Sequence, residues 1–223
     1  MYLGVSVYMN VHAVDIQDES NDYGLRSRQE YEIYVSTPNY NRTNAISYAN
    51  RYATTHSPYF TDYGDADCTN YVSQCLLAGG LQTNSVWNIP GTLGVSTVAW
   101  ATADGLKNYL KDYGLATKRS SWSKDGTPEP YVTWAYVNNS DQLTSNNTGE
   151  TVIFYDWDGA YGMTHAALFI RNNDATWDTG ADGNVTGDLM NQHSPDRDHV
   201  IWHGDKRNSM RATTRIYAFE INT

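Results

Sequence analysis

The alternation of hydrophobic and polar residues divides the chain into a helical first half and a last third that is rich in strands. Between Thr43 and His56, alanine and tyrosine recur every three or four residues, which is typical of a helix with one buried face. Asn41 and Thr43 are the candidates for its N-terminal cap, and Pro58 follows its end. We therefore predict a first helix over residues 43–56.

A second helix is predicted from Cys68, within the sequence DYGDADCTNYVSQCLLAGG. Asp65 and Asp67 offer carboxylates for the N-terminal cap, and the glycine pair at 79–80 supplies a stop. The apolar positions again follow the helical repeat: Cys68, Tyr71, Val72, Cys75 and Leu76.

Further along, STVAWATADGLKNYLKDYG predicts one helix from a cap at Ser96 to a stop at Gly114, although Gly105 costs about 1 kcal/mol of helix propensity. The rest of the segment 81–150 is expected to be rich in loops. Four later segments have the composition of short strands: ETVIFYDW, THAALFIR, DHVIWH and TRIYAFEI. Helices followed by strands predict an α+β domain with a mainly antiparallel sheet.

Residues 1–40 form a separate region by pattern. They contain one alternating segment, EYEIYVST, which predicts a strand, and TPNYNRT then reads as a link. We expect an N-terminal extension over residues 1–40 and one domain over residues 41–223.

Charge restricts the possible partners. The formal net charge is −10 and no run of basic residues occurs, which argues against nucleic acid and anionic membranes. No apolar stretch is long enough to span a bilayer. The first basic residue is Arg26, so the start lacks the charged region of a signal peptide. We expect either no export by that route or a trimmed fragment.

The two cysteines, Cys68 and Cys75, lie seven residues apart on one predicted helix. Their Cα atoms would be about 10 Å apart, too far for a disulfide, so both should be free thiols. Cys75 falls in the middle of the apolar stripe and is expected in the core. Cys68 falls in the first turn, where unpaired N–H groups and the helix dipole stabilise a thiolate. Cys68 is therefore either a nucleophile or a buried cysteine at a helix start.

A thiol nucleophile needs a general base, and the histidines offer six candidates: His12, His56, His165, His193, His199 and His203. His165 is the best placed, because it follows a glycine-rich turn and opens an apolar strand. A third residue should accept a hydrogen bond from the imidazole. The later segment LMNQHSPDRDH offers Asn191, Gln192, His193, Asp196 and Asp198, among which the pattern alone does not choose.

Two segments together, NRTNAISYANRYA and DADCTNYVSQCLLAGG, resemble the bacterial putative-amidase domain. That domain belongs to the papain-like, CHAP-type group of cell-wall hydrolases, which includes endolysin and autolysin catalytic domains. THAALFI and NQHSPDR resemble its histidine segment and the polar segment that follows. The resemblance covers roughly residues 40–220 and leaves out residues 1–40.

The resemblance implies a papain-like fold, with the cysteine at a helix N-terminus and the histidine on an antiparallel sheet. By this likeness, Cys68 is the nucleophile and His165 the general base and later the general acid. His193 is the first choice for the orienting residue, and Asp196 is the second. Asp67 would cap the helix and shape the turn, and the Cys68 N–H would join the oxyanion hole.

The resemblance also implies a substrate and a location. The expected reaction is hydrolysis of a peptidoglycan amide through a thioester, at a stem-peptide, cross-bridge or sugar–peptide bond, without a cofactor. The domain would act outside the cell or on the wall, as a phage lysin or autolysin does. An acidic domain gains no electrostatic attraction to an anionic wall, so we expect a separate targeting module.

Two functions of other classes compete with this hypothesis. A zinc amidase would use His199 and His203, with His165 and His193, but HVIWH reads as a strand in which residues i and i+4 lie about 13 Å apart. A non-catalytic cell-wall or carbohydrate-binding module would explain the 18 tyrosines and 7 tryptophans. In the catalytic hypothesis, the aromatic middle segment would line the cleft.

Calcium is a further possibility. DTGADGNVTGDL begins like an EF-hand loop, with Asp178, Asp182 and Gly183. Its twelfth position is Leu189, where a bidentate glutamate is required, so the EF-hand interpretation fails. Looser calcium sites would use Asp156 with Asp158, or Asp182 with Asp188.

Overall fold

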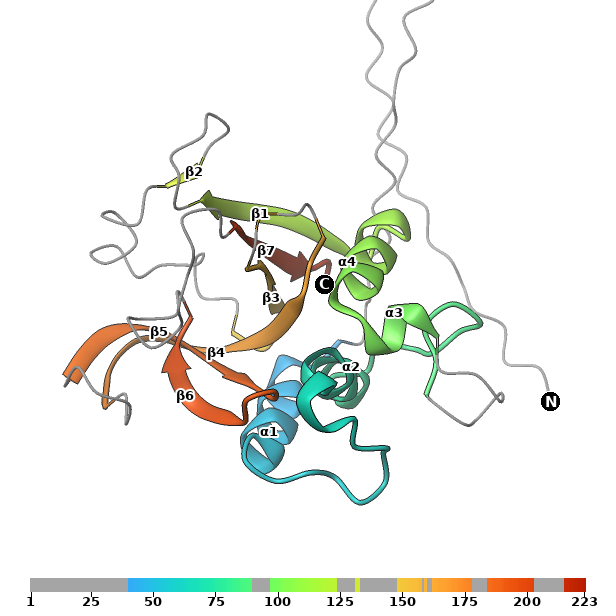
Figure 1. The fold of residues 1–223 in the computed structure, drawn as a ribbon, viewed down its shortest axis with the longest axis horizontal. Coiled ribbons are helices and arrows are strands. Elements are labelled where there is room, and N and C mark those ends of the chain that lie inside the picture. The colour runs from blue at the N-terminus through green and yellow to red at the C-terminus, as the bar shows by residue number, and fades with distance from the viewer. Residues whose placement is uncertain are drawn as a thin grey trace, which may run out of the picture.

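Helices come first in the described part of the chain, and strands follow (Figure 1). The computed structural model describes residues 40–89, 97–123, 131–132, 148–157, 159, 162–177, 184–202 and 215–223. The helices are α1 (Arg42–Tyr52), the 3-10 helix η1 (Gly64–Ala66), α2 (Cys68–Ala78), α3 (Val98–Ala101) and α4 (Ala103–Asp112). The strands are β1 (Ala116–Ser123), β2 (Tyr131–Val132), β3 (Thr151–Asp156), β4 (His165–Trp177), β5 (Asn184–Gln192), β6 (Arg197–Ile201) and β7 (Arg215–Ile221).

The strands of the described residues form one sheet in the order β2-β1-β7-β3-β4-β5-β6. All neighbours pair antiparallel, except that β2 pairs parallel with β1. This confirms the prediction of an α+β domain with a mainly antiparallel sheet. Two strands were not predicted. β1 lies in the segment 81–150, which was expected to be rich in loops, and β5 overlaps the calcium-loop candidate DTGADGNVTGDL. The predicted strand EYEIYVST lies outside the described residues.

Strand β3 and residues 165–170 of β4 are buried on both faces, so their two sets of alternating side chains enter two different cores. The face toward the helices carries Val152, Phe154, Ala166, Leu168 and Leu189. The opposite face carries Ile153, Tyr155, Ala167, Phe169 and Met190. Figure 1 shows α1 and α2 beside each other, and α2 packs against β4. Neighbouring residues of one strand therefore meet different parts of the molecule.

Helix α1 begins where the sequence predicts and ends earlier. Asn41 is its N-cap, and its side chain accepts a hydrogen bond of 3.1 Å from the Asn44 N–H. The predicted end at His56 is wrong, because the helix stops at Tyr52. In a longer helix the Tyr52 carbonyl would accept from the N–H of His56. It accepts instead from the His193 side chain, 2.6 Å away.

The single helix predicted between Ser96 and Gly114 is two helices, α3 and α4. Thr102 breaks the run with an extended backbone (φ −123°, ψ 140°), and its hydroxyl accepts from the Gly105 N–H. A Cβ atom at Gly105 would lie 2.4 Å from the Val98 carbonyl oxygen. Glycine is therefore required there so that α3 can pack against the first turn of α4.

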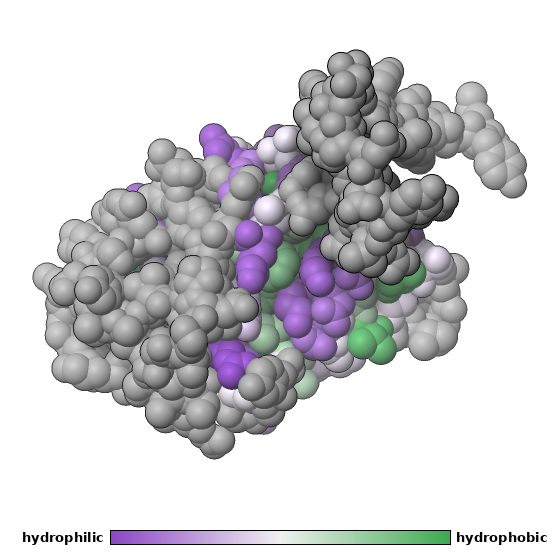
Figure 2. All heavy atoms as spheres, turned by 90° about the horizontal axis from the view of Figure 1, so that it is seen from above, coloured by the Kyte–Doolittle hydropathy of each residue, from purple (hydrophilic) through white to green (hydrophobic). Residues whose placement is uncertain are grey.

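Few large hydrophobic residues are exposed in the described part of the chain. Figure 2 shows hydrophilic and hydrophobic residues side by side on the described part of one face. Tyr59, Val86, Val98 and Tyr113 are the exposed large hydrophobic residues among those described. Among the described helices, none combines the length and the apolar content that a membrane span needs.

Candidate active site

Cys68 is the first residue of α2, and its side chain faces the beginning of β4. Only 8% of the residue is exposed. Burial alone raises the pKa of the Cys68 thiol, but the hydrogen bond and the charge of His165 outweigh it. The Thr69 hydroxyl, 3.6 Å from Sγ, and the Ala166 N–H also favour the thiolate. The resulting pKa is about 7, below the ordinary value of 9.0.

His165 is the first residue of β4, as predicted, and pairs with Tyr155 of β3. It is 5% exposed and lies beside the rings of Tyr155 and Trp157, at centroid distances of 5.5 and 5.9 Å. Its Nε2 atom lies 3.0 Å from Oε1 of Gln192. The structure thus joins a thiol, an imidazole and an amide in one chain of contacts.

The Gln192 amide fixes the tautomer of His165. Its Nε2 donates a 3.0 Å hydrogen bond to the Pro195 carbonyl, which can only accept, so Oε1 is the atom that faces His165. Oε1 can only accept as well, and the proton of a neutral His165 must therefore sit on Nε2. Nδ1 is then the nitrogen left to take the proton of the Cys68 thiol.

The structure places Gln192, and not His193, against His165. Leu168 of β4 pairs with Asn191 of β5, so the next residue along β5, Gln192, lies opposite Ala167 and on the same face as His165. His193 follows one position later and points to the helix side. The sequence offered both residues next to each other, and the register of the two strands decides between them.

His193 is bound on both sides by groups that accept hydrogen bonds. Its Nδ1 lies 2.6 Å from Oδ2 of Asp67, and its Nε2 lies 2.6 Å from the Tyr52 carbonyl oxygen. The ring is 2% exposed and lies between the rings of Tyr71 (4.1 Å) and His56 (4.4 Å). Burial lowers the pKa of His193, but the bonds to Asp67 and Tyr52 outweigh it, and the net shift is upward.

Asp67 immediately precedes Cys68, and its carboxylate is 1% exposed. The expected side-chain cap of α2 is wrong, since no such bond forms. The carboxylate instead accepts from His193, from the Tyr63 N–H (3.0 Å) and from the Asn70 amide (2.7 Å). Burial raises the pKa of Asp67, but these three donors outweigh it and hold the pKa below its ordinary value.

A second set of bonds joins the same two segments. The Asp67 N–H donates to the Ser194 hydroxyl (2.8 Å), which in turn donates to the Gly64 carbonyl (2.7 Å). The turn after Gln192 is therefore tied to the loop that leads into Cys68.

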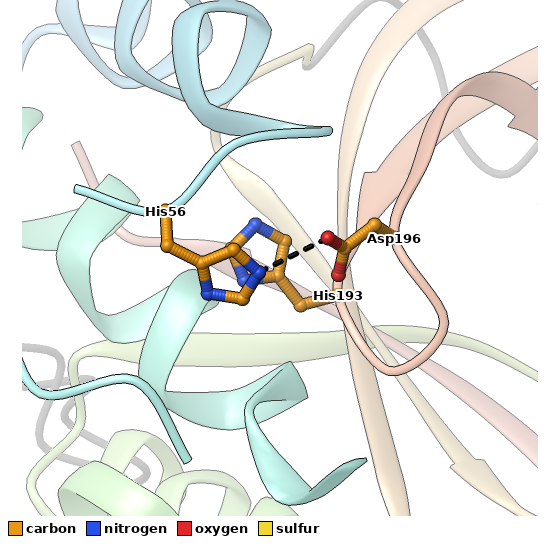
Figure 3. Close-up of side chains that lie close together, drawn as sticks. All are labelled: His56, His193 and Asp196. Atoms are coloured by element: carbon orange, nitrogen blue, oxygen red, sulfur yellow. Dashed lines mark hydrogen bonds and ion pairs between the residues drawn. The ribbon is translucent and has the colours of Figure 1, made fainter. Parts of the chain in front are cut away.

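Asp196, the second choice for the orienting residue, contacts His56 instead of His165. Its Oδ2 lies 3.0 Å from Nε2 of His56, as Figure 3 shows beside the His193 ring. Nδ1 of His56 lies 3.1 Å from Asp62 and 3.8 Å from Asp67. The pattern gave no sign that His56 would lie here, because its partners are distant in the sequence.

Two groups of side chains have the spacing of metal ligands: His56 with His193 and Asp196, and His56 with Asp62 and Asp67. The ligand atoms of each group lie within 4.8 Å of one another. Both nitrogens of His193 are already held, however, and coordination through His193 would break one of those bonds.

The residues that the sequence offers for the alternative zinc and calcium sites lie only partly within the described residues. His199 binds Asp198 through Nδ1 at 2.5 Å, while His203 lies outside the described residues. Asp156 accepts from the Gly159 N–H, and Asp188 is buried. The other calcium candidates lie outside the described residues: Asp158, Asp178, Asp182 and Gly183.

Two tryptophans of the middle segment do not line a cleft. Trp87 and Trp100 are both fully buried and lie in the helix-side core, with ring centroids 4.9 Å apart. Among the described tryptophans, Trp157 lies beside the site, stacked on Tyr155.

Comparison with known proteins identifies a family and two relatives. A family model described as "Putative amidase domain" matches residues 39–217. The chain is 25% identical over 158 residues to the uncharacterized protein YhbB of Bacillus subtilis (strain 168), a match that covers 68% of this chain and 43% of YhbB. It is 34% identical over 102 residues to the uncharacterized protein YjcM of the same organism, covering 45% of this chain and 24% of YjcM. The matched regions span less than half the length of either relative, and no solved structure matches the chain significantly.

Proposed function

Because this chain belongs to the putative amidase domain family, we propose that it is a cysteine-dependent amide hydrolase. The observation that carries the proposal is the contact chain from Cys68 through His165 to Gln192, in which the thiol has a pKa of about 7. A thiol with that pKa is partly ionised at neutral pH, and the imidazole that lowers it is placed to accept its proton.

In the proposed reaction, Nδ1 of His165 takes the proton of Cys68 while Sγ attacks the amide carbonyl carbon. The tetrahedral intermediate collapses as the C–N bond breaks, and His165 gives the proton to the leaving amine. The resulting thioester is then attacked by water, which gives its proton to His165. When the C–S bond breaks, the proton returns to Cys68, and the net reaction consumes one amide and one water.

Two further groups would support these steps. Gln192 would hold the Nε2–H group of His165 in place throughout the cycle, the role that the family resemblance implied for His193. The Cys68 N–H belongs to the first turn of α2, whose N–H groups have no acceptor within the helix. It would stabilise the oxyanion of the intermediate.

We propose bacterial peptidoglycan as the substrate, with cleavage at a stem-peptide, cross-bridge or sugar–peptide amide. Its basis is the resemblance of the cysteine and histidine segments to cell-wall hydrolases. The domain would then act at the cell wall and would depend on another module for attachment, because its net charge is −10. The chemistry above uses no metal or cofactor.

The test is digestion of purified peptidoglycan followed by mass spectrometry of the released fragments, which also identifies the bond that is cut. We expect wild type and Cys75→Ala to release the same fragments. We expect Cys68→Ala to lower the rate by at least about 10³-fold. Equal release by Cys68→Ala would refute the cysteine mechanism. Loss of release upon addition of a chelator would favour a metal amidase instead.

A further inference from the structure

The strongest feature outside the proposed catalytic chain is the cluster around His193, shown in part in Figure 3. Asp67, which precedes α2, and Tyr71 of α2 face His193. His56 faces it from the segment after α1, and Asp196 belongs to its own turn. Among the described residues, these are the titratable side chains that surround the ring.

The two bonds of His193 determine its charge. A carboxylate and a backbone carbonyl both accept hydrogen bonds and cannot donate them. A neutral imidazole has one N–H and can serve only one of these two partners, Asp67 and Tyr52. The other partner would then face a nitrogen lone pair at 2.6 Å. Only the imidazolium form can donate to both at these distances.

Asp67 and His193 are each the sequence neighbour of a proposed catalytic-site residue. Asp67 is covalently linked to Cys68, and His193 is covalently linked to Gln192. The bond between Asp67 and His193 therefore spans the short gap between the nucleophile's segment and the orienting residue's segment. Ser194 makes a second connection across the same gap, through its hydroxyl.

We propose that His193 is a positioning residue: as an imidazolium held between Asp67 and the Tyr52 carbonyl, it keeps Cys68 in register with His165 and Gln192. The proposal rests on the proposed function, since it concerns the same thiol. The upward shift of the pKa of His193 agrees with it. His193 does not touch the reacting atoms, and its effect is exerted through Asp67.

The first experiment measures the charge of His193 in the wild-type chain by nitrogen NMR of ¹⁵N-labelled protein, with the ring signals assigned by through-bond correlation to the assigned backbone. We expect both ring nitrogens to carry hydrogen at pH 7, because the pKa of His193 is raised above its ordinary value of 6.5. A neutral ring at pH 7 would overturn the proposal. This measurement needs no substrate and no stable variant.

The second experiment measures the pH dependence of Cys68 alkylation by iodoacetamide in wild type, His193→Gln and a control, His199→Asn. His199 is another carboxylate-bonded histidine, and it has a positive φ of 53° that asparagine tolerates. We expect His193→Gln to raise the pH midpoint of Cys68 alkylation. Labelling of Cys68 at pH 6 should slow by about tenfold for each pH unit of that rise. The control should match wild type.

These outcomes separate the two proposals. An ordinary thiol profile in wild type would refute the cysteine mechanism, while the NMR result would still decide the charge of His193. An activated profile that is the same in wild type and in folded His193→Gln would leave the mechanism intact and would refute the positioning role. A purely structural role of His193 would lower the melting temperature without moving the midpoint in the protein that remains folded.

Discussion

The beginning and the middle of α2 carry the same side chain in opposite states. Cys68 and Cys75 are both buried free thiols on one helix. The pKa of Cys68 is about 7, whereas burial raises the pKa of Cys75 well above its ordinary value of 9.0. The difference in exposure is small, 8% against 0%. Burial therefore does not decide the chemistry, and the partners of each sulfur do.

Those partners follow from position along the helix. In the first turn, backbone N–H groups are free of helical partners, and a strand can approach the helix end with a histidine. In the middle, every N–H is used within the helix, and the neighbouring side chains belong to the core. One helix thus supplies an activated thiol and an inert one without any change of residue type.

The largest expected effect is the difference in labelling rate between the two thiols. We predict that iodoacetamide modifies Cys68 in the native protein at pH 7 at least about 10³-fold faster than Cys75, whose exposure needs opening of the core. Peptide mapping by mass spectrometry after timed quenching measures both rates. Comparable labelling rates for the two cysteines would contradict the conclusion that Cys68 is activated and Cys75 is inert.

The next effect concerns stability at the beginning of the helix. Replacing Asp67 with asparagine leaves the His193 charge buried without its partner, and we expect a loss of about 3–5 kcal/mol in unfolding free energy. Chemical denaturation at several pH values measures it, with Asp65→Asn on the exposed 3-10 helix as the control.

The pH dependence of that loss has a definite sign. The pKa of Asp67 is lowered, so its contribution is present above 3.8 and disappears as pH falls through the folded-state value. The pKa of His193 is raised, so its contribution is present below 6.5 and disappears as pH rises through the folded-state value. The cost of Asp67→Asn should therefore be greatest between about pH 4 and 6.5, and a cost independent of pH would argue against an ion pair.

A third effect is on the thiol itself. Without His165, only the smaller contributions of Thr69 and Ala166 oppose the effect of burial, and the pKa of Cys68 should return to 9 or higher. At pH 6 this lowers the thiolate fraction, and with it the labelling rate of His165→Ala, by on the order of 100-fold. Gln192→Ala keeps the imidazole and should cause a smaller loss. A His165→Ala variant that labels like wild type would show that the helix end alone activates the thiol.

Local sequence patterns predicted those features of the site that depend on a single helix or strand. The starts of α2 at Cys68 and of β4 at His165 follow from the apolar repeat and the flanking turns, and the structure places both as predicted. The choice between Gln192 and His193 does not follow from pattern. It depends on the pairing of β4 with β5, and a change of one residue in register exchanges the two faces.

The surroundings of Asp67 lay further beyond the sequence. Its main partner, His193, is 126 positions away, and the hydrogen bond between them replaces the local cap that an aspartate before a helix normally makes. The early end of α1 has the same cause, because the Tyr52 carbonyl bonds to His193. The N-terminal cap of α2 and the end of α1 therefore both depart from the local prediction, and both departures involve hydrogen bonds to the His193 imidazole.

The smallest expected effect concerns Cys75, the inert thiol. Cys75→Ala removes one buried sulfur from a site bordered by Tyr71 and should lower the unfolding free energy by only about 1 kcal/mol. The labelling profile of Cys68 should stay the same, since Cys75 is not among the groups that shift the pKa of Cys68. Denaturation and alkylation of the same sample measure both quantities. A shifted Cys68 midpoint in Cys75→Ala would mean that the core of α2 positions its first turn, and that the two thiols are coupled through the helix rather than independent.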